Sequence, residues 1–294
     1  MKPPEQIPPE FIEQYTMANK IKIEYWYFDE TSSSDKPLIY SRDTIDQYIE
    51  EIKQGRLFYY GKMDRCLYQA LKKYSISGMQ VAIMGSQTPL YESICLAYGG
   101  HPKTIEYNRL ISEDPRLEVM TPAEYDESPV LFDAGFSISS FEHDGLGRYG
   151  DPLNPEGDLL AMKKMKSMIK TNGLLFLSVP VGRDILVWNA HRIYGIRRLP
   201  LLLKGWRLLD VKWASLDRPS WEYQPVFILE NSDTEGKNVR WVWMQMMLFM
   251  PLQFFMRSLR FGIKKVLRKA IRFMIGEASF IRLKKSIYKK GDLN

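Results

Sequence analysis

The run from Glu142 to Asp151 gathers carboxylates, a histidine and an arginine within ten residues. A histidine is suited to proton transfer, because its unperturbed pKa of about 6.5 lies near neutral pH. His143 is therefore the first candidate for a general base, with Glu142 or Asp144 orienting its ring, and His191 is the second. We assign proton transfer to His143, Asp144 and His191.

Neighbouring polar side chains are suited to holding a ligand. The planar guanidinium groups of arginines bind anionic or polyhydroxylated molecules through paired hydrogen bonds. The expected substrate-binding residues are Arg148, Tyr149, Asp151 and Arg192. A structural alternative stays open, in which His143 and Asp144 cap the loop, Arg148 pairs with Asp151 to brace it, and Asp158 caps the following helix.

Glycines and apolar runs indicate how these side chains are positioned. Four glycines between Gly135 and Gly150 allow the loop positive φ angles and close contact with a ligand. From residue 79 onward, short apolar runs alternate with helical patterns, which is typical of a mostly parallel sheet with crossover helices. The seven expected strands cover residues 81–84, 104–107, 117–120, 130–133, 174–179, 206–213 and 226–229. The expected helices cover residues 43–55, 62–74, 89–98 and 155–170.

The first two expected strands end in residues that suit a nucleoside. The turn Gly85 to Pro89 follows the first strand, and Glu106 lies 21 residues beyond Gly85. An acid at a spacing of about 20 residues accepts hydrogen bonds from both ribose hydroxyls. The turn lacks the three glycines that let a dinucleotide pyrophosphate approach a helix, which favours S-adenosylmethionine, a ligand without phosphate. The expected cofactor-binding residues are Gly85, Ser86, Gln87, Glu106 and Asp133.

The order of the elements and three long motifs resemble known families. A seven-strand α/β sheet whose last two strands form a hairpin resembles the Rossmann-like, class I methyltransferases. Residues 142–158, 179–184 and 189–195 are similar to the Caenorhabditis-type domain-of-unknown-function family 268, as are Gly85 to Pro89, Glu92 and residues 106–108. The resemblance covers roughly residues 76–210. It implies a methyltransferase-like fold, and it supplies neither a substrate nor catalytic residues.

Composition limits the other possibilities. The chain has 294 residues, is 45% apolar and contains two cysteines, Cys66 and Cys95, so it can fill a substantial core. Neither cysteine has a close partner at metal-ligand spacing, and we therefore expect neither a disulfide framework nor a bound metal. The N-terminus has no apolar run suited to a secretory signal, which favours a cytoplasmic location.

The last part of the chain is basic. Residues 257–294 carry a net charge of +10, and residues 1–256 carry −4. Apolar residues recur at helical period within 259–275 with basic residues opposite, which predicts a basic amphipathic helix. Two interpretations compete. In the first, the helix packs on the body; in the second, residues 239–290 bind an anionic membrane surface, and the protein is peripheral at that membrane. Nucleic acid is the less favoured partner. The uncharged run 241–256 is shorter than the roughly 20 residues of a membrane-spanning helix.

The sequence thus predicts an N-terminal irregular and helical segment (1–75), a Rossmann-like domain (76–235) and a basic helical tail (236–294). The leading functional hypothesis is a methyltransferase dependent on S-adenosylmethionine, acting on a small-molecule or glycan-like acceptor. The second is a catalytically silent methyltransferase-like binding or scaffold protein, which the glycine-poor turn favours. A nucleotide-sugar transferase would need a metal-binding acidic pair, and Asp133-Ala134-Gly135 is a poor match to one. A nicotinamide reductase is less favoured still, because of the same turn.

Overall fold

The computed structural model describes residues 2–31, 37–212 and 224–232. All of them belong to one compact unit, Met1–Trp241. The predictions for the tail, which concern residues 236–294, 239–290 and 241–256, lie outside the described residues. Within the described ranges, no helix has the length and apolar character needed to cross a membrane.

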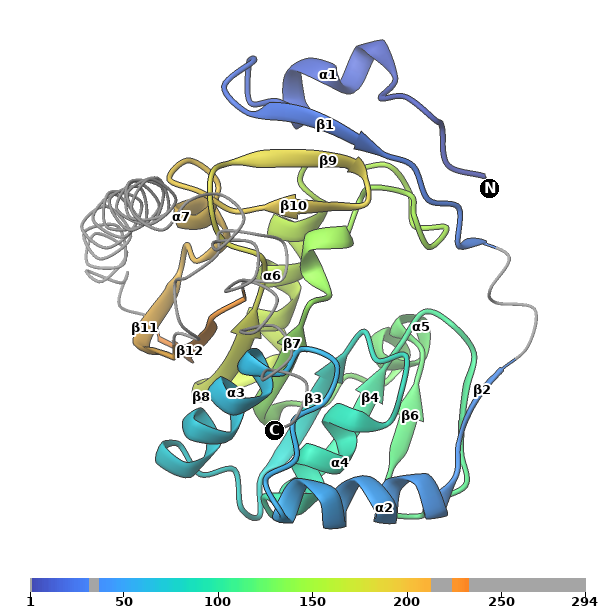
Figure 1. The fold of residues 1–294 in the computed structure, drawn as a ribbon, viewed down its shortest axis with the longest axis vertical. Helices are drawn as coiled ribbons and strands as arrows, with labels where there is room; N and C mark the ends of the chain where they lie inside the picture. The colour runs from blue at the N-terminus through green and yellow to red at the C-terminus, as the bar shows by residue number, and fades with distance from the viewer. Residues whose placement is uncertain (1, 32–36, 213–223, 233–294) are drawn as a thin grey trace, which may run out of the picture. The chain divides into compact units, whose positions relative to one another are not determined.

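Seven strands form the central sheet, in the order β11-β12-β8-β7-β3-β4-β6 (Figure 1). Strands β6, β4, β3, β7 and β8 run parallel, whereas β12 is antiparallel to both β8 and β11. The predicted α/β sheet with a C-terminal hairpin is confirmed. The strands are β3 (Gln80–Met84), β4 (His101–Ile105), β6 (Glu118–Met120), β7 (Phe132–Ile138), β8 (Ile169–Ser178), β11 (Trp206–Lys212) and β12 (Val226–Asn231).

Short helices connect the parallel strands. Helix α4 (Leu90–Ala97) joins β3 to β4, α5 (Pro122–Glu127) joins β6 to β7, and α6 (Gly157–Met168) joins β7 to β8. Helix α5 begins at a capping box, in which Thr121 and Glu124 bond each other's backbone amides. The short α7 (Leu199–Leu202) precedes β11. These crossovers position loops at the carboxyl ends of the strands.

Two helices precede the sheet. Helix α2 (Arg42–Lys53) is capped by Ser41 and begins one residue before the expected start, and α3 (Lys62–Lys73) follows. The apolar face of α2 packs with strand and helix residues in a buried cluster, where each fully buried side chain contributes about 1.5–3 kcal/mol. The cluster contains Tyr40, Ile45, Ile49 and Leu117, with Leu96 and Ala97 of α4 against it.

The N-terminal residues complete two small sheets. Strand β1 (Lys22–Trp26) runs parallel to β9 (Ile185–Asn189), and β10 (His191–Ile193) pairs with β9 in the antiparallel sense. In Figure 1 these three strands lie side by side at the top, with α1 (Pro9–Tyr15) beyond β1. Strand β2 (Leu38–Tyr40) pairs with β5 (Leu110–Ser112). Residues 1–75 therefore contribute strands that pair with the rest of the body.

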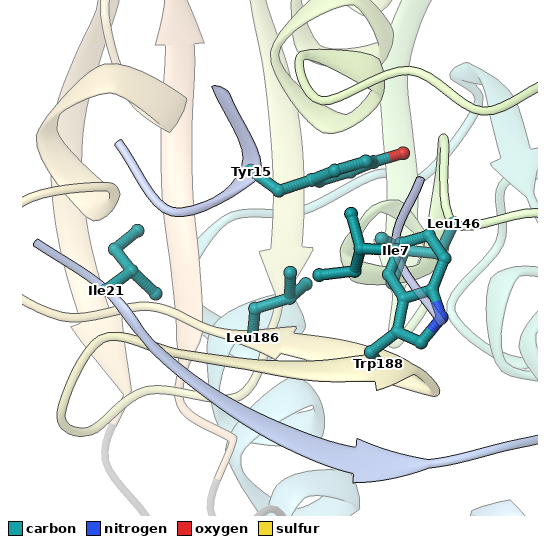
Figure 2. Packing of buried hydrophobic residues seen from close by; sticks show 6 residues of the cluster. All are labelled: Ile7, Tyr15, Ile21, Leu146, Leu186 and Trp188. Carbon is teal, nitrogen blue, oxygen red and sulfur yellow. The ribbon is translucent and has the colours of Figure 1, made fainter. Parts of the chain in front are cut away.

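An apolar cluster fixes the N-terminal residues onto β9 and onto the loop that follows β7. Figure 2 shows its side chains, which come from all three segments. The Tyr15 hydroxyl donates a hydrogen bond to the Gly145 carbonyl, and the Asn189 side chain bonds both the amide and the carbonyl of Phe28. The cluster contains Ile7, Tyr15, Ile21, Leu146, Leu186 and Trp188. The charged loop is thus held from its outer side.

The predicted boundaries of two elements are wrong. The fourth strand was expected over residues 130–133, but β7 begins at Phe132 and continues to Ile138, so Asp133 lies near its start. The last helix was expected to continue to residue 170, but α6 ends at Met168, and β8 begins at Ile169. Val130 and Leu131 are exposed and are not part of the strand, because the buried run starts only at Phe132.

Candidate functional site

The carboxyl ends of β3 and β7 meet at the centre of the sheet. Met84 pairs with Ser137, so the turn that begins at Gly85 faces the segment that follows Ile138. Gly85 has φ +66°, and a Cβ atom there would lie 2.2 Å from Ser140 Oγ. Only glycine fits this position, because the two loops are in direct contact. In doubly wound sheets, ligands bind outside the carboxyl ends of the strands, at the point where the strand order reverses.

Buried side chains support the turn after β3. Ser86 Oγ lies 2.8 Å from the Thr88 carbonyl and 3.0 Å from Glu92 Oε2. Thr104 donates to Glu92 Oε1 at 2.7 Å, and the Tyr40 hydroxyl donates to the Ser86 carbonyl at 2.8 Å. Burial raises the pKa of Glu92 to about 7. Side-chain hydrogen bonds from β2, α4 and β4 therefore fix a turn that contains only one glycine.

Glu106 lies beside this turn, directly after β4. Its Oε1 accepts a hydrogen bond from the Asn108 amide at 3.0 Å. Burial raises the pKa of the Glu106 carboxyl, while the backbone amides of Asn108, Tyr107 and Ser86 act in the opposite direction. The Ser86 amide belongs to the β3 turn, and the exposed Gln87 follows it. The structure thus brings together four of the predicted cofactor-binding residues: Gly85, Ser86, Gln87 and Glu106.

Asp133 lies near the start of β7, at the opposite ends of the parallel strands from Gly85 and Glu106. Its carboxylate pairs with Lys170 at 2.7 Å and accepts a hydrogen bond from the amide of Gln80, the first residue of β3. The bond from Lys170 lowers the pKa of Asp133. Gly85 follows the last residue of the same strand, so Asp133 is separated from the other predicted cofactor residues. We leave it out of the proposed site.

Glu142 is the most deeply buried carboxylate of the loop after β7. It lies in a short 3-10 helix, Phe141–His143, and is 1% exposed. Its Oε1 accepts a hydrogen bond from Ser139 Oγ at 2.7 Å, whereas its buried Oε2 has no partner among the described residues. Burial raises the pKa of Glu142 to about 7. Ser139 has φ +52°, a strained conformation for a residue with a side chain, of the kind that concentrates at functional sites.

His143 lies beside Glu142, and its ring contacts that of His191 edge-on. His143 Nδ1 is 2.6 Å from the Ala190 carbonyl, which can only accept, so Nδ1 carries the proton and Nε2 is left as an acceptor. Burial and the charge of Arg148 lower the pKa of His143 to about 3. The same two causes lower the pKa of His191 to about 4. Both rings are neutral at pH 7, so His143 is a weaker base than the sequence indicated.

Arg148 pairs with Glu30 of the N-terminal segment, so the predicted pairing with Asp151 is wrong. Its Nη2 lies 2.8 Å from Glu30 Oε1. The guanidinium carbon lies 4.4 Å from the centre of the Phe28 ring and 5.0 Å from that of Tyr149, distances typical of cation–π contacts. Tyr149 in turn contacts the His143 ring edge-on. Arg148 and Tyr149 therefore lie next to the histidines.

Two other predicted substrate-binding residues bond the loop's own backbone. Asp151 Oδ2 accepts hydrogen bonds from the amides of Gly145 and Gly147, at 2.7 and 3.1 Å. Arg192 is buried and donates to the Asp144 carbonyl at 2.6 Å. An irregular buried loop leaves backbone groups that need such partners. Bracing of the loop, which was the structural alternative, thus occurs through partners that the sequence did not indicate.

Asp144 contributes its carbonyl to this framework. Burial and the charge of Asp151 raise the pKa of its carboxyl group. Among the described residues, it is the Ala190 carbonyl that bonds His143 Nδ1 and orients the ring, and not the Asp144 carboxylate. The predicted catalytic role of Asp144 has therefore no direct contact to support it.

A buried ion pair that sequence reasoning missed anchors α6. Asp158, expected as a helix cap, accepts hydrogen bonds from Arg198 and from the Tyr194 hydroxyl at 2.9 Å. The cap position is occupied by Glu156. Asp184 similarly accepts hydrogen bonds from the backbone amides of residues 195, 197 and 198. The charged residues of the long motifs could have indicated buried ion pairs, but the sequence does not show which residues pair, because the partners of Asp184 and Asp158 lie 11 to 40 residues away.

In the part of the chain that the structure describes, no group of three or more His, Cys, Asp or Glu side chains could hold a metal ion. The arrangement instead offers hydrogen-bond acceptors in the segments that follow two strands of the sheet, β4 and β7. Glu106 lies on the β4 side, and Glu142 and His143 lie on the β7 side.

Comparisons with known proteins give a family and a set of remote structural likenesses. A 1,6-didemethyltoxoflavin-N1-methyltransferase of Burkholderia thailandensis, solved with 1,6-didemethyltoxoflavin and S-adenosylhomocysteine, is 13% identical, with a TM-score of 0.46 over 64% of this chain and 87% of that one. A candidate hemolysin of Streptococcus thermophilus is 13% identical, with a TM-score of 0.45 over 69% and 78%. The N-methyltransferase NodS of Bradyrhizobium japonicum, in complex with S-adenosylhomocysteine, is 10% identical, with a TM-score of 0.42 over 64% and 97%.

No curated protein matches the chain. The family model that matches is described as Caenorhabditis protein of unknown function, DUF268, and it aligns with residues 78–221. The matched range contains the β3 turn, Glu106, the loop after β7 and the long motifs recognised in the sequence. Over residues 78–221, the chain therefore belongs to the Caenorhabditis family of unknown function, DUF268.

Proposed function

We propose that the protein is a methyltransferase that binds S-adenosylmethionine at the carboxyl ends of β3 and β4 and methylates a small molecule. The observation that carries the proposal is the place of Glu106, half-buried directly after β4 and against the Ser86 amide of the β3 turn. A carboxylate so placed can accept hydrogen bonds from two vicinal ribose hydroxyls. The strand order, with β12 inserted antiparallel between β8 and β11, supports the same class of fold.

The residues at this edge fit the chemistry of the nucleoside. Glu106 supplies acceptors, the exposed Gln87 supplies an amide that can donate and accept, and no phosphate-binding glycine pattern is required. When bound, S-adenosylmethionine supplies an activated methyl group on a sulfonium ion. The chain's own residues would hold the adenosine part and orient the molecule that receives the methyl group.

Calorimetric titration with S-adenosylmethionine and S-adenosylhomocysteine tests the proposal. We expect wild type to bind both, and Glu106→Ala to weaken binding by about 1–3 kcal/mol, the loss of charge-assisted hydrogen bonds. Glu127→Ala is the matched control, since Glu127 is exposed at the end of α5, before β7 begins. Unchanged affinity in Glu106→Ala would remove this residue from the site.

A silent binding or scaffold protein is the second candidate function. It is favoured by the β3 turn, in which the Ser86 hydroxyl and carbonyl are already bonded to Thr88, Glu92 and Tyr40. A turn saturated in this way offers a ligand fewer free groups. Absence of binding by wild type in the same titration would support this candidate and end the enzyme proposal.

Two finer parts of the proposal concern the partners. A glycan-like acceptor is one member of the small-molecule class, and residues 239–290 are proposed to contact an anionic membrane surface from the cytoplasmic side. Flotation with anionic liposomes, with and without residues 239–294, tests the second point. Equal flotation of both forms would remove the membrane contact.

A further inference from the structure

Unpartnered polar atoms gather around the His143 ring. Among the described residues, five buried side-chain atoms have no hydrogen-bond partner, and three of them are Glu142 Oε2, His191 Nε2 and Arg148 Nε. His143 connects them, because its ring contacts that of His191 edge-on and it shares the Ala190 carbonyl with Arg148. Buried polar groups are nearly always paired in native proteins. Such a concentration points to a bound ligand.

Glu142 and His143 each present a free acceptor atom. Glu142 Oε1 is already bonded to Ser139, whose hydroxyl is also bonded by Gln224 Nε2 at 3.0 Å, so the carboxylate is fixed in place. Oε2 remains open to a donor. His143 Nε2 lies 3.8 Å from Glu142 Oε1, and it too can only accept in this tautomer. A ligand that satisfies both must therefore carry an N–H or O–H group.

Charges and rings around Glu142 narrow the class of ligand. The positive charges of Arg148 and Arg192 lie close enough to lower the pKa of Glu142 against the effect of burial, so they oppose a second cation. Tyr60, Tyr91 and Tyr149 lie near the carboxylate, which in turn raises the pKa of each phenol in addition to burial. The rings of Tyr149 and His191 both contact the His143 ring edge-on. Aromatic neighbours of this kind suit a flat ring rather than a charged chain.

We infer that Glu142 and His143 form the end of a ligand site that takes an uncharged hydroxyl or amino group on a ring-bearing molecule, and that Glu142 accepts the proton this group loses. In the step, the O–H or N–H bond of the ligand breaks and its proton bonds to Glu142 Oε2. The electron pair stays on the ligand oxygen or nitrogen, which becomes nucleophilic. As an account of the methyl acceptor, the inference rests on the proposed function.

Glu142 is a better proton acceptor than the predicted base His143. A general base works best when its pKa lies near the operating pH. The pKa of Glu142 is raised to about 7 by burial, whereas that of His143 is lowered to about 3 by burial and by Arg148. The groups that interact with Glu142 come from several segments: Ser139, His143 and Asp144 of its own segment, Arg148 and Tyr149 of the loop, Arg192 of β10, Tyr194 after it, Tyr60 of the turn before α3, and Tyr91 of α4.

The three histidines of the chain allow a direct binding test without any methyl donor. Phenol and anisole share a ring, but only phenol can donate a hydrogen bond. We expect phenol to shift the imidazole NMR signals of His143 and His191, while His101, exposed at the start of β4, serves as the internal reference. Anisole should bind at least about tenfold more weakly than phenol, because a site of buried acceptors rejects a ligand that lacks the donor.

Glu142→Gln and Glu156→Gln form the matched pair of variants. Glu142→Gln should weaken phenol binding by about tenfold or more, the loss of a hydrogen bond to a charged group, and Glu156→Gln should bind like wild type because Glu156 is exposed. In ligand-free wild type, the His143 signal should also follow a titration near pH 7 that belongs to Glu142 and is absent from Glu142→Gln. A circular dichroism spectrum like that of wild type shows that each variant is folded.

Three outcomes would overturn the inference: phenol shifts neither His143 nor His191, phenol and anisole bind equally, or Glu142→Gln binds phenol like wild type. These outcomes are separate from a failure of the proposed function, because the samples contain no S-adenosylmethionine. Phenol binding without S-adenosylmethionine binding would keep the ligand site and end the methyltransferase proposal. The reverse result would leave the cofactor site and remove Glu142 from the acceptor site.

Discussion

Replacing Asp158 with alanine should reveal how strongly the site depends on its buried ion pair. Asp158 is 0% exposed, and its carboxylate binds Arg198 Nε at 2.8 Å and the Tyr194 hydroxyl at 2.9 Å. Arg192 Nε lies 3.8 Å away. Removal of the Asp158 carboxylate leaves the guanidinium groups of Arg198 and Arg192, which are 6% and 3% exposed, without their anion. Breaking a buried pair in this way costs about 3–5 kcal/mol.

That loss is large against a total stability of about 5–15 kcal/mol. At about 2–4 °C for each kcal/mol in a domain of this size, the melting temperature should fall by about 6–20 °C. Burial alone would raise the pKa of Asp158, but Arg192 and Arg198 outweigh it and hold the pKa below its usual value. The contribution of Asp158 is therefore present above the unfolded pKa and is lost as the pH falls through the folded one.

Urea denaturation followed by circular dichroism measures the effect. Asp126→Ala is the control, since its pair with Lys164 has side chains 59% and 47% exposed and should contribute no more than about 1 kcal/mol. The double variant Asp158→Leu/Arg198→Met should be more stable than Asp158→Ala, because it leaves one unpaired charge fewer. Equal losses in Asp158→Ala and Asp126→Ala would refute the reasoning.

Three further predictions concern the β3 turn, the residue Glu92 that supports it, and Glu142. Gly85→Ala should lower the free energy of unfolding and weaken S-adenosylmethionine binding, because the added Cβ would collide with Ser140. Its control is Gly55→Ala, which should cost less, about 1–2 kcal/mol, because Gly55 also has a positive φ, +78°, but lies in open space. The stability of wild type relative to Glu92→Gln should fall as the pH rises from 4.5 to about 7 and stay constant above, since burial raises the folded pKa of Glu92 to about 7. Methylation of phenol should speed up as the pH rises through about 7, when Glu142 ionises, and Glu142→Gln should lack this dependence.

The sheet could be predicted because its strands are short apolar runs between helical patterns. Val81 to Met84 and Val226 to Leu229 are unbroken apolar stretches, as expected for strands covered on both faces. Strand β7 was misplaced because its sequence, FDAGFSI, contains Asp133, which reads as the end of an apolar run. Asp133 is tolerated near the start of the strand, where Lys170 and the Gln80 amide bind it.

The pairing of the N-terminal strands could not be predicted, because their partners are distant in sequence. Strand β1 pairs with β9, whose residues lie more than 150 positions later. Strand β9 itself was not recognised, although Ile185 to Trp188 is an apolar run. Nothing local distinguishes a strand of a small added sheet from an extended loop, and tertiary contacts decide its conformation.

The charged loop could be located from the sequence, but the roles within it could not. Asp151 and Arg192 have the residue types of a binding site, and in the fold they satisfy backbone amides and carbonyls of the loop itself. Glu142 was expected only to orient His143, and its burial with a free oxygen depends on side chains from several distant elements. Residue type shows what a group can bind, whereas burial and neighbours decide what it does bind.

The most direct test of the account is whether Glu106 recognises the ribose of S-adenosylmethionine. Calorimetry would compare S-adenosylhomocysteine with its 2′-deoxy analogue, in wild type and in Glu106→Ala. We predict that wild type prefers the hydroxylated ligand, that Glu106→Ala loses the preference, and that the coupling energy is about 1–3 kcal/mol. Absence of binding, or an equal preference in both proteins, would contradict the central claim.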